Sequence, residues 1–250
     1  MRILLIDIET APHVVYAWGL FNQNLSPDKI AIPSYTMCWA ARWVGEEEIV
    51  FSSLFEDGHE TMIYKMYDLL DQADVVVHYN GKKFDIPTLN KEFTLLNLPP
   101  PHDYKEVDLY HLVRQRFRFA SNKLDYIVQE LGLGAKVKHK GMDLWTECMS
   151  GDPLAWSTMK SYNIQDVVIL QNLYEYVLPW IKNHPNFGLF VDSPESPICP
   201  NCGSTHVIKS GYSYTSVGKY QRFQCKTCGK KSRARKRMAT TSDNVLVGVN

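Results

Sequence analysis

The chain has 250 residues, of which 45% are hydrophobic and 22% are charged. This composition fits a soluble globular protein with a substantial core, built as one large domain or as one large and one small domain. No run of 18 apolar residues occurs, which excludes a membrane-spanning helix of the usual length. The apolar start ends at Asp7 and is too short for a signal peptide. We therefore expect a cytoplasmic protein with reduced cysteines.

The net charge of zero hides an uneven distribution. Residues 197–245 hold ten of the 27 Lys and Arg residues but one of the 27 Asp and Glu residues, so this segment carries a net charge of +9 and the remainder −9. A basic segment joined to an acidic body predicts a polyanionic partner. The acidic body would repel that partner unless bound cations neutralise its carboxylates.

Hydrophobic periodicity predicts the elements in chain order. Strands are predicted over residues 2–9, 35–44, 46–53 and 74–80. Helices are predicted over residues 59–73, 84–97 and 121–134, the last with Ser121 or Asn122 as its N-cap. Residues 106–113 fit a short strand that runs into a helix, and residues 153–184 fit a helical stretch interrupted at Pro179. This order predicts an α/β domain with a mixed sheet flanked by helices.

Composition also predicts where the domains end. Residues 183–198 are rich in Pro, Asn and Ser, as in a linker, and Cys, Lys, Arg and Gly become frequent after them. We expect a first domain over residues 1–190, a second over 197–237, and a disordered tail over 238–250.

The segment LLIDIETAP carries two acids, Asp7 and Glu9, inside the first predicted strand. Residues two apart in a strand face the same side, so both carboxylates point one way while Ile6 and Ile8 point into the core. Two adjacent like charges are unfavourable unless a cation lies between them, and a hard divalent cation with oxygen ligands fits that need. A strand end with two solvated acids is the alternative.

Later segments carry further acids. HYNGKKFDIP places Asp85 just after a buried strand, where a capping role is the alternative. SYNIQD places Tyr162 and Asp166 four residues apart, and hence on one face of a helix. Asp108, at a strand-to-helix junction, is expected to be a helix cap rather than a ligand.

D-x-E in the first strand, N-x-x-x-F-D after a middle strand and Y-x-x-x-D in a late helix form an ordered set. This set resembles the DEDD superfamily of 3′–5′ exonucleases, on a ribonuclease H-like fold. The histidine subclass would have His where this chain has Ser161, so the resemblance is to the tyrosine subclass. DIET, YNGKKFD and YNIQD are most similar to the proofreading domain of family B DNA polymerases and to its stand-alone, often phage-borne relatives. The similarity covers about residues 1–185.

The resemblance implies roles for these residues. Asp7, Glu9 and Asp166 would hold one Mg²⁺ or Mn²⁺, Asp7 would also hold a second, and Asp85 would act through metal-bound water. Two metals about 4 Å apart stabilise the attacking and leaving oxygens of an in-line displacement. Tyr162 would orient the water or the scissile phosphate, because a phenol with a pKa of about 10 is a poor base at pH 7.

Substrate contacts are expected nearby. GAKVKHKG contains Lys136, Lys138 and Lys140, which fit either phosphate contacts beside the site or a solvated loop. Asn80 and Phe84 are expected to hold the terminal nucleotide, Phe84 by stacking.

CPNCG and CKTCG carry four cysteines in two C-x-x-C-G turns: Cys199, Cys202, Cys225 and Cys228. This spacing predicts one structural Zn²⁺ in a zinc ribbon, whose small apolar content leaves the metal to supply the folding energy. Two disulfides or a redox pair are the alternatives, which the expected compartment and the duplicated motif disfavour. Cys38 and Cys148 are expected to be ordinary core residues.

The run GKKSRARKR, which includes Arg233 and Arg235, lies close to several aromatic residues in the sequence. It suits contacts to a nucleic-acid backbone together with base stacking, and a solubilising basic tail is the alternative. The whole pattern predicts a metal-dependent 3′–5′ exonuclease with a nucleic-acid-binding zinc ribbon. DNA is favoured over RNA, replication or recombination proteins are candidate partners, and the oligomeric state is open. A structure-specific endonuclease or an RNase on the same fold, or a non-catalytic nucleic-acid-binding factor, are the alternatives.

Overall fold

A computed structural model describes residues 1–19, 21–239 and 246. The chain forms two compact units, residues 2–174 and residues 175–250 with Met1, which are described separately below. The tail predicted over residues 238–250 lies outside the described residues, apart from residues 238, 239 and 246.

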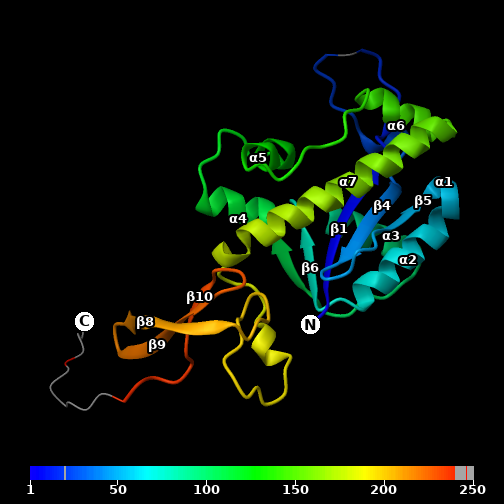
Figure 1. Ribbon diagram of the computed structural model, residues 1–250. Coiled ribbons are helices and arrows are strands. Elements are labelled where there is room, and N and C mark those ends of the chain that lie inside the picture. Colours follow the sequence, from blue (N-terminus) through cyan, green and yellow to red (C-terminus); the bar gives the residue numbers. More distant parts are fainter. Residues whose placement is uncertain (20, 240–245, 247–250) are drawn as a thin grey trace. The chain divides into compact units, whose positions relative to one another are not determined.

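The first unit is built on a five-stranded mixed sheet with the strand order β5-β4-β1-β6-β7 (Figure 1). Its strands are β1 (Ile3–Thr10), β4 (Thr36–Trp43), β5 (Val50–Ser53), β6 (Val75–His78) and β7 (Lys105–Asp108). The central strand β1 runs antiparallel to β4 and parallel to β6. The predicted mixed sheet is thereby confirmed.

Helices cover both faces of this sheet. They are α1 (Leu54–Asp57), α2 (His59–Asp71), α3 (Asp85–Leu95), α4 (Leu109–Arg116), α5 (Leu124–Glu130), α6 (Met142–Met149) and α7 (Pro153–Val177). One apolar cluster joins α2 and α3 to β1 and β4, and a second joins α6 and α7 to the start of β4. The long helix α7 crosses the sheet beside β1 (Figure 1).

The alternation along β1 decides which side chains meet α7. Leu4, Ile6 and Ile8 are at most 2% exposed and belong to the cluster with α2 and α3. Asp7 and Glu9 therefore face the other side of the sheet. Their partners on β4 are Ala40 and Cys38, whose small side chains leave room for two carboxylates above the sheet.

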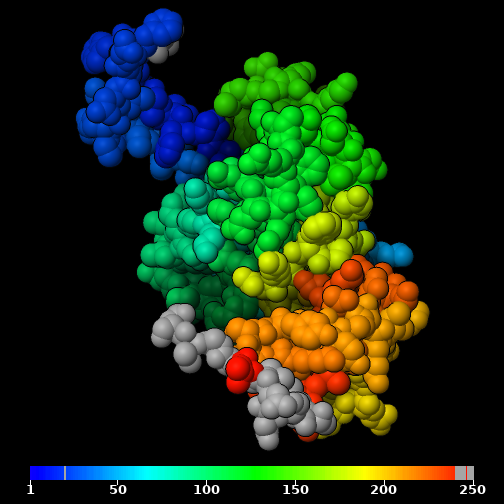
Figure 2. All heavy atoms as spheres, turned by 90° about the vertical axis from the view of Figure 1, so that its left-hand side faces the viewer, coloured from blue at the N-terminus to red at the C-terminus, as the bar shows by residue number. Residues whose placement is uncertain are grey.

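A segment between β1 and β4 projects from the first unit (Figures 1 and 2). It contains β2 (Val14–Val15), the short 3-10 helix η1 (Pro27–Lys29) and β3 (Ile30–Ile32), and β2 pairs with β3 antiparallel. Trp18 on this segment is 99% exposed. The sequence patterns predicted no element here.

One predicted helix start was wrong, and one predicted helical stretch is interrupted at Pro179 as expected but does not extend to His184. Helix α5 begins at Leu124 after Lys123, and the Ser121 hydroxyl accepts the Lys123 N–H instead of capping the helix. Helix α7 ends at Val177 and passes into the 3-10 helix η2 (Leu178–Trp180), which contains Pro179. Proline lacks an N–H and cannot continue an α-helix hydrogen-bond ladder, so the helical stretch stops well before His184.

The second unit contains a three-stranded antiparallel sheet in the order β10-β9-β8. After the end of α7 and η2, its elements are the 3-10 helix η3 (Phe187–Leu189) and the strands β8 (Val207–Thr215), β9 (Gly218–Cys225) and β10 (Lys231–Arg233). Within residues 197–239, Cys199, Asn201 and Cys225 are the buried residues. Such a small core cannot stabilise this segment by apolar burial alone.

No helix among the described residues combines the length and the apolar character that crossing a membrane requires.

Candidate functional site

Three carboxylates from two elements meet above the central strand. Asp7 and Glu9 of β1 lie beside Asp166 of α7, and one oxygen of each lies within 4.8 Å of the others. Oxygen ligands at such mutual distances can bind one hard divalent cation together. The sheet and the long helix bring together residues that are 157 or more positions apart in the sequence.

Asp166 is buried, with 1% exposure. Its Oδ2 accepts a hydrogen bond from Lys136 Nζ at 2.5 Å, while Oδ1 has no hydrogen-bond partner among the described residues. Burial raises the pKa of Asp166, although Lys136 and a hydrogen bond from Tyr162 oppose the rise. A buried carboxylate oxygen without a donor is a fitting ligand for a cation.

The acids of β1 repel one another and Asp166. Burial, followed by the charges of Asp166, Glu9 and Asp85, raises the pKa of Asp7 well above its ordinary value. Burial and the Asp166 charge raise the pKa of Glu9 to about 8, although Lys136 and Trp145 oppose the rise. A bound divalent cation would offset this repulsion, so the donor set and its electrostatics fit the Mg²⁺ or Mn²⁺ that the sequence predicts.

Two neutral side chains lie beside these acids. Asn163 Nδ2 donates to Asp7 Oδ2 at 2.7 Å, and the Trp145 side chain lies close enough to Glu9 to lower its pKa. The sequence analysis missed both residues. A signal for Asn163 was available, because it lies in the Y-x-x-x-D motif next to Tyr162.

Asp85 begins helix α3 and lies outside the group of three. It is 4% exposed, and its Oδ1 accepts the main-chain N–H of Ile8 at 3.2 Å. Burial raises its pKa to about 6, against the opposing influence of His78 and of the Ile8 N–H. Asp85 is therefore anchored to the strand that carries Asp7 and Glu9.

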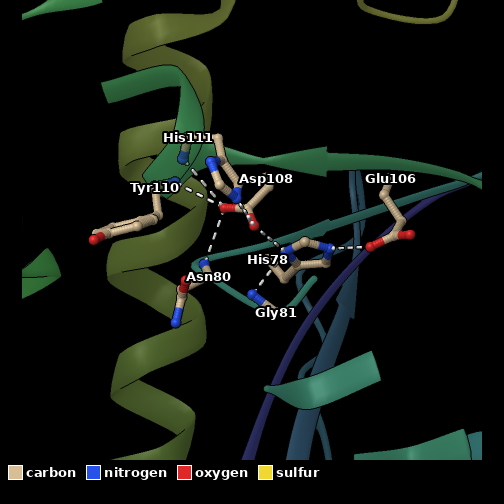
Figure 3. A network of polar contacts seen from close by, with 7 residues as sticks. All are labelled: His78, Asn80, Gly81, Glu106, Asp108, Tyr110 and His111. Carbon is tan, nitrogen blue, oxygen red and sulfur yellow. Dashed lines mark hydrogen bonds and ion pairs between the residues drawn. The ribbon is translucent and has the colours of Figure 1, made fainter. Parts of the chain in front are cut away.

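A polar network fastens the turn that leads from β6 to Asp85 (Figure 3). Asp108 Oδ1 accepts the main-chain N–H groups of Asn80 and Tyr110, each at 3.0 Å. It also accepts the His111 N–H, so Asp108 caps α4 as the sequence predicts. One carboxylate thereby fixes the start of α4 and the backbone at Asn80, which has a φ of 66°.

His78 forms the other half of this network. It is fully buried, its Nε2 lies 3.0 Å from Glu106 Oε2, and its Nδ1 accepts the Gly81 N–H at 3.1 Å. A side chain at Gly81 would place its Cβ 2.5 Å from the imidazole ring. Glycine is therefore required where the turn passes over His78.

A hollow of about 450 Å³ opens beside the carboxylates. Its lining includes Asp7, Asn80, Tyr110 and Lys136. Asn80 and Asp7 thus line the same hollow. Phe84, four residues further along the same turn, is 44% exposed and is not part of this lining.

The three lysines of GAKVKHKG have different surroundings. Lys136 donates to Tyr162 Oη at 3.0 Å as well as to Asp166. Lys138 and Lys140 line a separate hollow of about 430 Å³. The loop does not act as a single basic surface at the carboxylates.

Tyr162 is buried beside Lys136 and Asp166, with 7% exposure. Burial and the charges of Asp166 and Glu9 raise the pKa of its phenol, against the effect of Lys136. The ring also meets the His139 ring edge-to-face at 4.8 Å. The phenol therefore keeps its proton at neutral pH and can donate it in a hydrogen bond, but it is no base.

The four cysteines of the second unit converge with ligand atoms within 4.8 Å of one another. The Sγ atoms of Cys199 and Cys228, and those of Cys202 and Cys225, are 3.6 Å apart. A tetrahedral Zn²⁺ with bonds of about 2.3 Å requires sulfur spacings of about 3.8 Å. All six cysteines of the chain are free thiols, so the arrangement fits a zinc ribbon and not a disulfide pair.

The glycine after each cysteine pair has the left-handed backbone that the turn needs. Gly203 has a φ of 74° and Gly229 a φ of 81°. Their N–H groups reach back to the carbonyls of Cys199 and Cys225, which closes both turns around the sulfur cluster. Side chains rarely tolerate this backbone region, so glycine is the suitable residue.

Cations and aromatic rings pair on the ribbon. The Arg233 guanidinium lies 3.9 Å from the Tyr220 ring centre, and Lys219 Nζ lies 3.8 Å from that of Tyr212. Arg233 and Arg235 both line a hollow of about 550 Å³ within the second unit. The surface therefore carries positive charge and flat apolar rings together.

Comparisons with known proteins agree with this fold. No curated protein matches the chain. A solved structure that is similar is that of the family B DNA polymerase from the hyperthermophilic archaeon Pyrobaculum calidifontis, with a TM-score of 0.55 and 20% sequence identity. The match covers 71% of this chain and 24% of the polymerase chain, so this chain spans about a quarter of the polymerase. At such low identity the likeness shows the fold alone.

The family comparison goes further. The sequence profile of the RNase H superfamily matches residues 25–178, which is more than half of the chain. The matched part contains Asp85, Tyr162 and Asp166 and begins after Asp7 and Glu9. With its ribonuclease H-like sheet, the chain belongs to the RNase H superfamily.

Proposed function

We propose that this protein is a metal-dependent nuclease of the DEDD tyrosine subclass that removes nucleotides from the 3′ end of nucleic acid. The observation that carries the proposal is the meeting of Asp7, Glu9 and Asp166 within 4.8 Å, with the Tyr162 phenol one helical turn from Asp166. Membership of the RNase H superfamily is consistent with it. The polymerase named above shares the fold, and the sequence motifs resemble the proofreading domain of family B DNA polymerases.

The residues of the site have different proposed roles. Asp7, Glu9 and Asp166 would hold the cations, and Asp85, which accepts the Ile8 N–H, would act through metal-bound water. Mg²⁺ or Mn²⁺ bound there supplies charge stabilisation for the scissile phosphate and activation of water.

Two further groups act on the phosphate side. Tyr162 keeps its proton and orients an oxygen of the phosphate or the water by donating a hydrogen bond. Lys136 lies on the border between Asp166 and the hollow beside Asp7, where its ammonium can pair with a phosphate oxygen. The terminal nucleotide would enter that hollow past Asn80.

The ribbon would supply affinity. One structural Zn²⁺ held by Cys199, Cys202, Cys225 and Cys228 would order it. Its Arg–Tyr and Lys–Tyr pairs would contact phosphates and bases, with DNA as the favoured substrate. Replication or recombination proteins are proposed partners, and the cytoplasm is the proposed location because it keeps the four thiols reduced.

A panel of labelled substrates tests the proposal. Linear oligonucleotides of DNA and RNA carry the label at the 5′ end, and a covalently closed circular DNA serves as the substrate without ends. With Mg²⁺ or Mn²⁺, we expect 5′-labelled DNA to shorten stepwise from its 3′ end while the circle stays intact. Asp166→Ala is the control for contaminating nuclease.

Each other outcome selects an alternative. Cutting of the circle would replace the proposal with a structure-specific endonuclease, and shortening of RNA alone with an RNase. Binding without any hydrolysis by the zinc-loaded protein would leave a nucleic-acid-binding factor.

A further inference from the structure

One buried amide holds the carboxylate of Asp7 from the helix opposite. Asn163 is fully buried on α7. Its Nδ2 donates to Asp7 Oδ2 at 2.7 Å and to the Asp7 main-chain carbonyl at 3.2 Å. The same amide therefore fixes the side chain and the backbone of one residue, and it ties α7 to β1 at the level of the carboxylates.

The orientation of this amide follows from its surroundings. Asn163 Oδ1 has no hydrogen-bond partner among the described residues. Turning the amide over would place that oxygen against Asp7 Oδ2, so that two acceptors would face each other. In the observed orientation, Asn163 Oδ1 has no partner while Nδ2 makes two hydrogen bonds to Asp7. A buried group left unsatisfied in this way calls for an explanation beyond packing.

We propose that Asn163 is a positioning residue that orients the Asp7 carboxylate for metal binding. The inference rests on the function proposed above and adds a residue to its site. Repulsion from Glu9 and Asp166 acts to turn Asp7 away from them. The short bond from Asn163 restrains that rotation, so the ligand is in place before a cation arrives. Mutation of a residue that hydrogen-bonds a metal ligand typically lowers metal affinity or activity about 10–100-fold.

A neutral donor suits this task better than a charged one. Lys136 also bonds a ligand of the group, but its ammonium carries a positive charge that repels an arriving cation. The Asn163 amide holds Asp7 without adding charge. The two donors therefore have different effects on metal binding, and removal of Asn163 weakens the site without relieving any repulsion of the cation.

The test compares two asparagines of the same helix. Asn163→Leu keeps a side chain of similar size and removes the donor. Asn172→Leu is the matched control, because Asn172 Nδ2 donates to the Leu133 carbonyl at 2.9 Å and not to a carboxylate. Binding of Mn²⁺ to the full-length, zinc-loaded protein is measured without substrate, by electron paramagnetic resonance of the free ion.

We expect Asn163→Leu to raise the Kd for Mn²⁺ about 10–100-fold and Asn172→Leu to leave it unchanged. In hydrolysis, excess Mn²⁺ should restore much of the kcat of Asn163→Leu, while the KM for the oligonucleotide stays that of the wild type. Cooperative thermal unfolding of each variant shows that it is folded. If Asn163→Leu does not fold, Asn163→Ser, which is smaller and also lacks the amide, is judged by the same Kd.

The outcomes separate the two proposals. A wild-type protein that binds no Mn²⁺ at the carboxylates overturns the proposed function. Wild-type binding together with an unchanged Kd in the folded Asn163 variant overturns the positioning role alone. An equal loss of affinity in Asn172→Leu would also overturn it, because the effect would then be a general loosening of α7.

Discussion

The two candidate metal centres of this chain are built in opposite ways. In the first unit, Asp7, Glu9 and Asp166 project from a central strand and a long helix that are packed by large apolar clusters. In the second unit, four cysteines lie on two short turns, and three buried residues make up the interior of residues 197–239. The first centre has a scaffold that folds around an apolar core, and the second has almost none.

This difference separates two uses of a metal. Carboxylates crowded on a rigid scaffold repel one another, so the fold bears an electrostatic cost until a cation binds. Thiolates on flexible turns bind zinc and thereby gain the structure that their own core cannot provide. Metal removal should therefore unfold the second unit and leave the first folded but inactive.

Zinc loss should have the largest effect. Cys228→Ser removes one of four ligands, and we expect the second unit to lose its fold, since structural zinc contributes an apparent 10–16 kcal/mol in zinc-finger peptides. The checks are the zinc content, one ion per chain in the wild type, and the dispersion of amide signals from residues 197–239 in an NMR spectrum. Cys148→Ser is the matched control and should retain one zinc. A Cys228→Ser protein with a full set of dispersed ribbon signals would contradict the comparison.

Loss of a carboxylate in the first unit should abolish activity and leave the fold intact. Asp7→Ala should lower kcat by more than about 10³-fold, because a catalytic metal contributes several kcal/mol of transition-state stabilisation. The metal-free first unit should stay folded or gain stability, since one source of repulsion is gone. Single-turnover hydrolysis and urea unfolding measure the two effects, with the exposed Asp68→Ala as control. Turnover at the wild-type rate, with contaminating nuclease excluded, would refute the assignment of Asp7.

Tyr162→Phe should have a smaller effect, because the ligands remain. The phenol donates one oriented hydrogen bond, and the loss of such a bond in a transition state costs about 10²–10³-fold in kcat. Excess Mn²⁺ should not restore the rate, in contrast to a weakened ligand set. Tyr64→Phe, on an exposed tyrosine of α2, is the control. A fully active Tyr162→Phe would remove the tyrosine-subclass assignment and leave the metal site standing.

The sequence predicted much of this architecture because its signals are local. Alternation along β1, the apolar run of β6 and the spacing of Tyr162 and Asp166 each depend on neighbouring residues, and the structure shows the predicted elements. The cap at Asp108 was confirmed for the same reason. The cysteine spacing is likewise a local signal, since each C-x-x-C-G pair forms a single turn.

Other features depend on contacts between distant segments and carry no local signal. Helix α6 was not predicted, because it has only 8 residues and packs through Leu144 and Cys148. Its Trp145 reaches Glu9, which lies in another element. Lys136 was grouped with Lys138 by sequence, but the fold turns Lys136 toward Asp166 and leaves Lys138 at another hollow.

The turn before Asp85 offers a moderate test of scaffold rigidity. Gly81→Ala would place a Cβ 2.5 Å from the His78 ring, which its bond to Glu106 holds in position. We expect a loss of about 1–3 kcal/mol in the free energy of unfolding of the first unit, as for other overpacked sites. Hydrolysis should also slow, because the turn delivers Asp85. Lys83→Ala, on an exposed residue of the same turn, should change neither quantity.

An unchanged unfolding free energy in Gly81→Ala would mean that the turn can move away from His78. The scaffold would then be less rigid than the comparison of the two units assumes. Zinc content should be unaffected in either case, because the substitution lies in the first unit.

The response to pH should be opposite in the two units. The pKa of Glu9 is raised from 4.5 to about 8 in the folded protein, so between these values the folded chain retains a proton that the unfolded chain has released. Without Mg²⁺ or Mn²⁺, the free energy of unfolding of the first unit should therefore fall as pH rises from about 4.5 to 8. The slope is at most about 1.4 kcal/mol per pH unit for one group. The zinc ribbon should instead lose stability as the pH falls, because protonated thiols release zinc.

Urea unfolding followed by tryptophan fluorescence can isolate the first unit, since five of the six tryptophans lie within residues 2–174. Glu9→Gln cannot ionise and should flatten the slope, whereas Glu60→Gln, on an exposed acid of α2, should keep it. Saturating Mg²⁺ should also flatten it, because a bound cation stabilises the charged carboxylates and returns the pKa of Glu9 toward its ordinary value. Equal slopes in the wild type and in Glu9→Gln would show that Glu9 ionises freely in the folded state. Glu9 would then add no repulsion to the first centre, and the contrast with the zinc ribbon would rest on the other carboxylates and on core size.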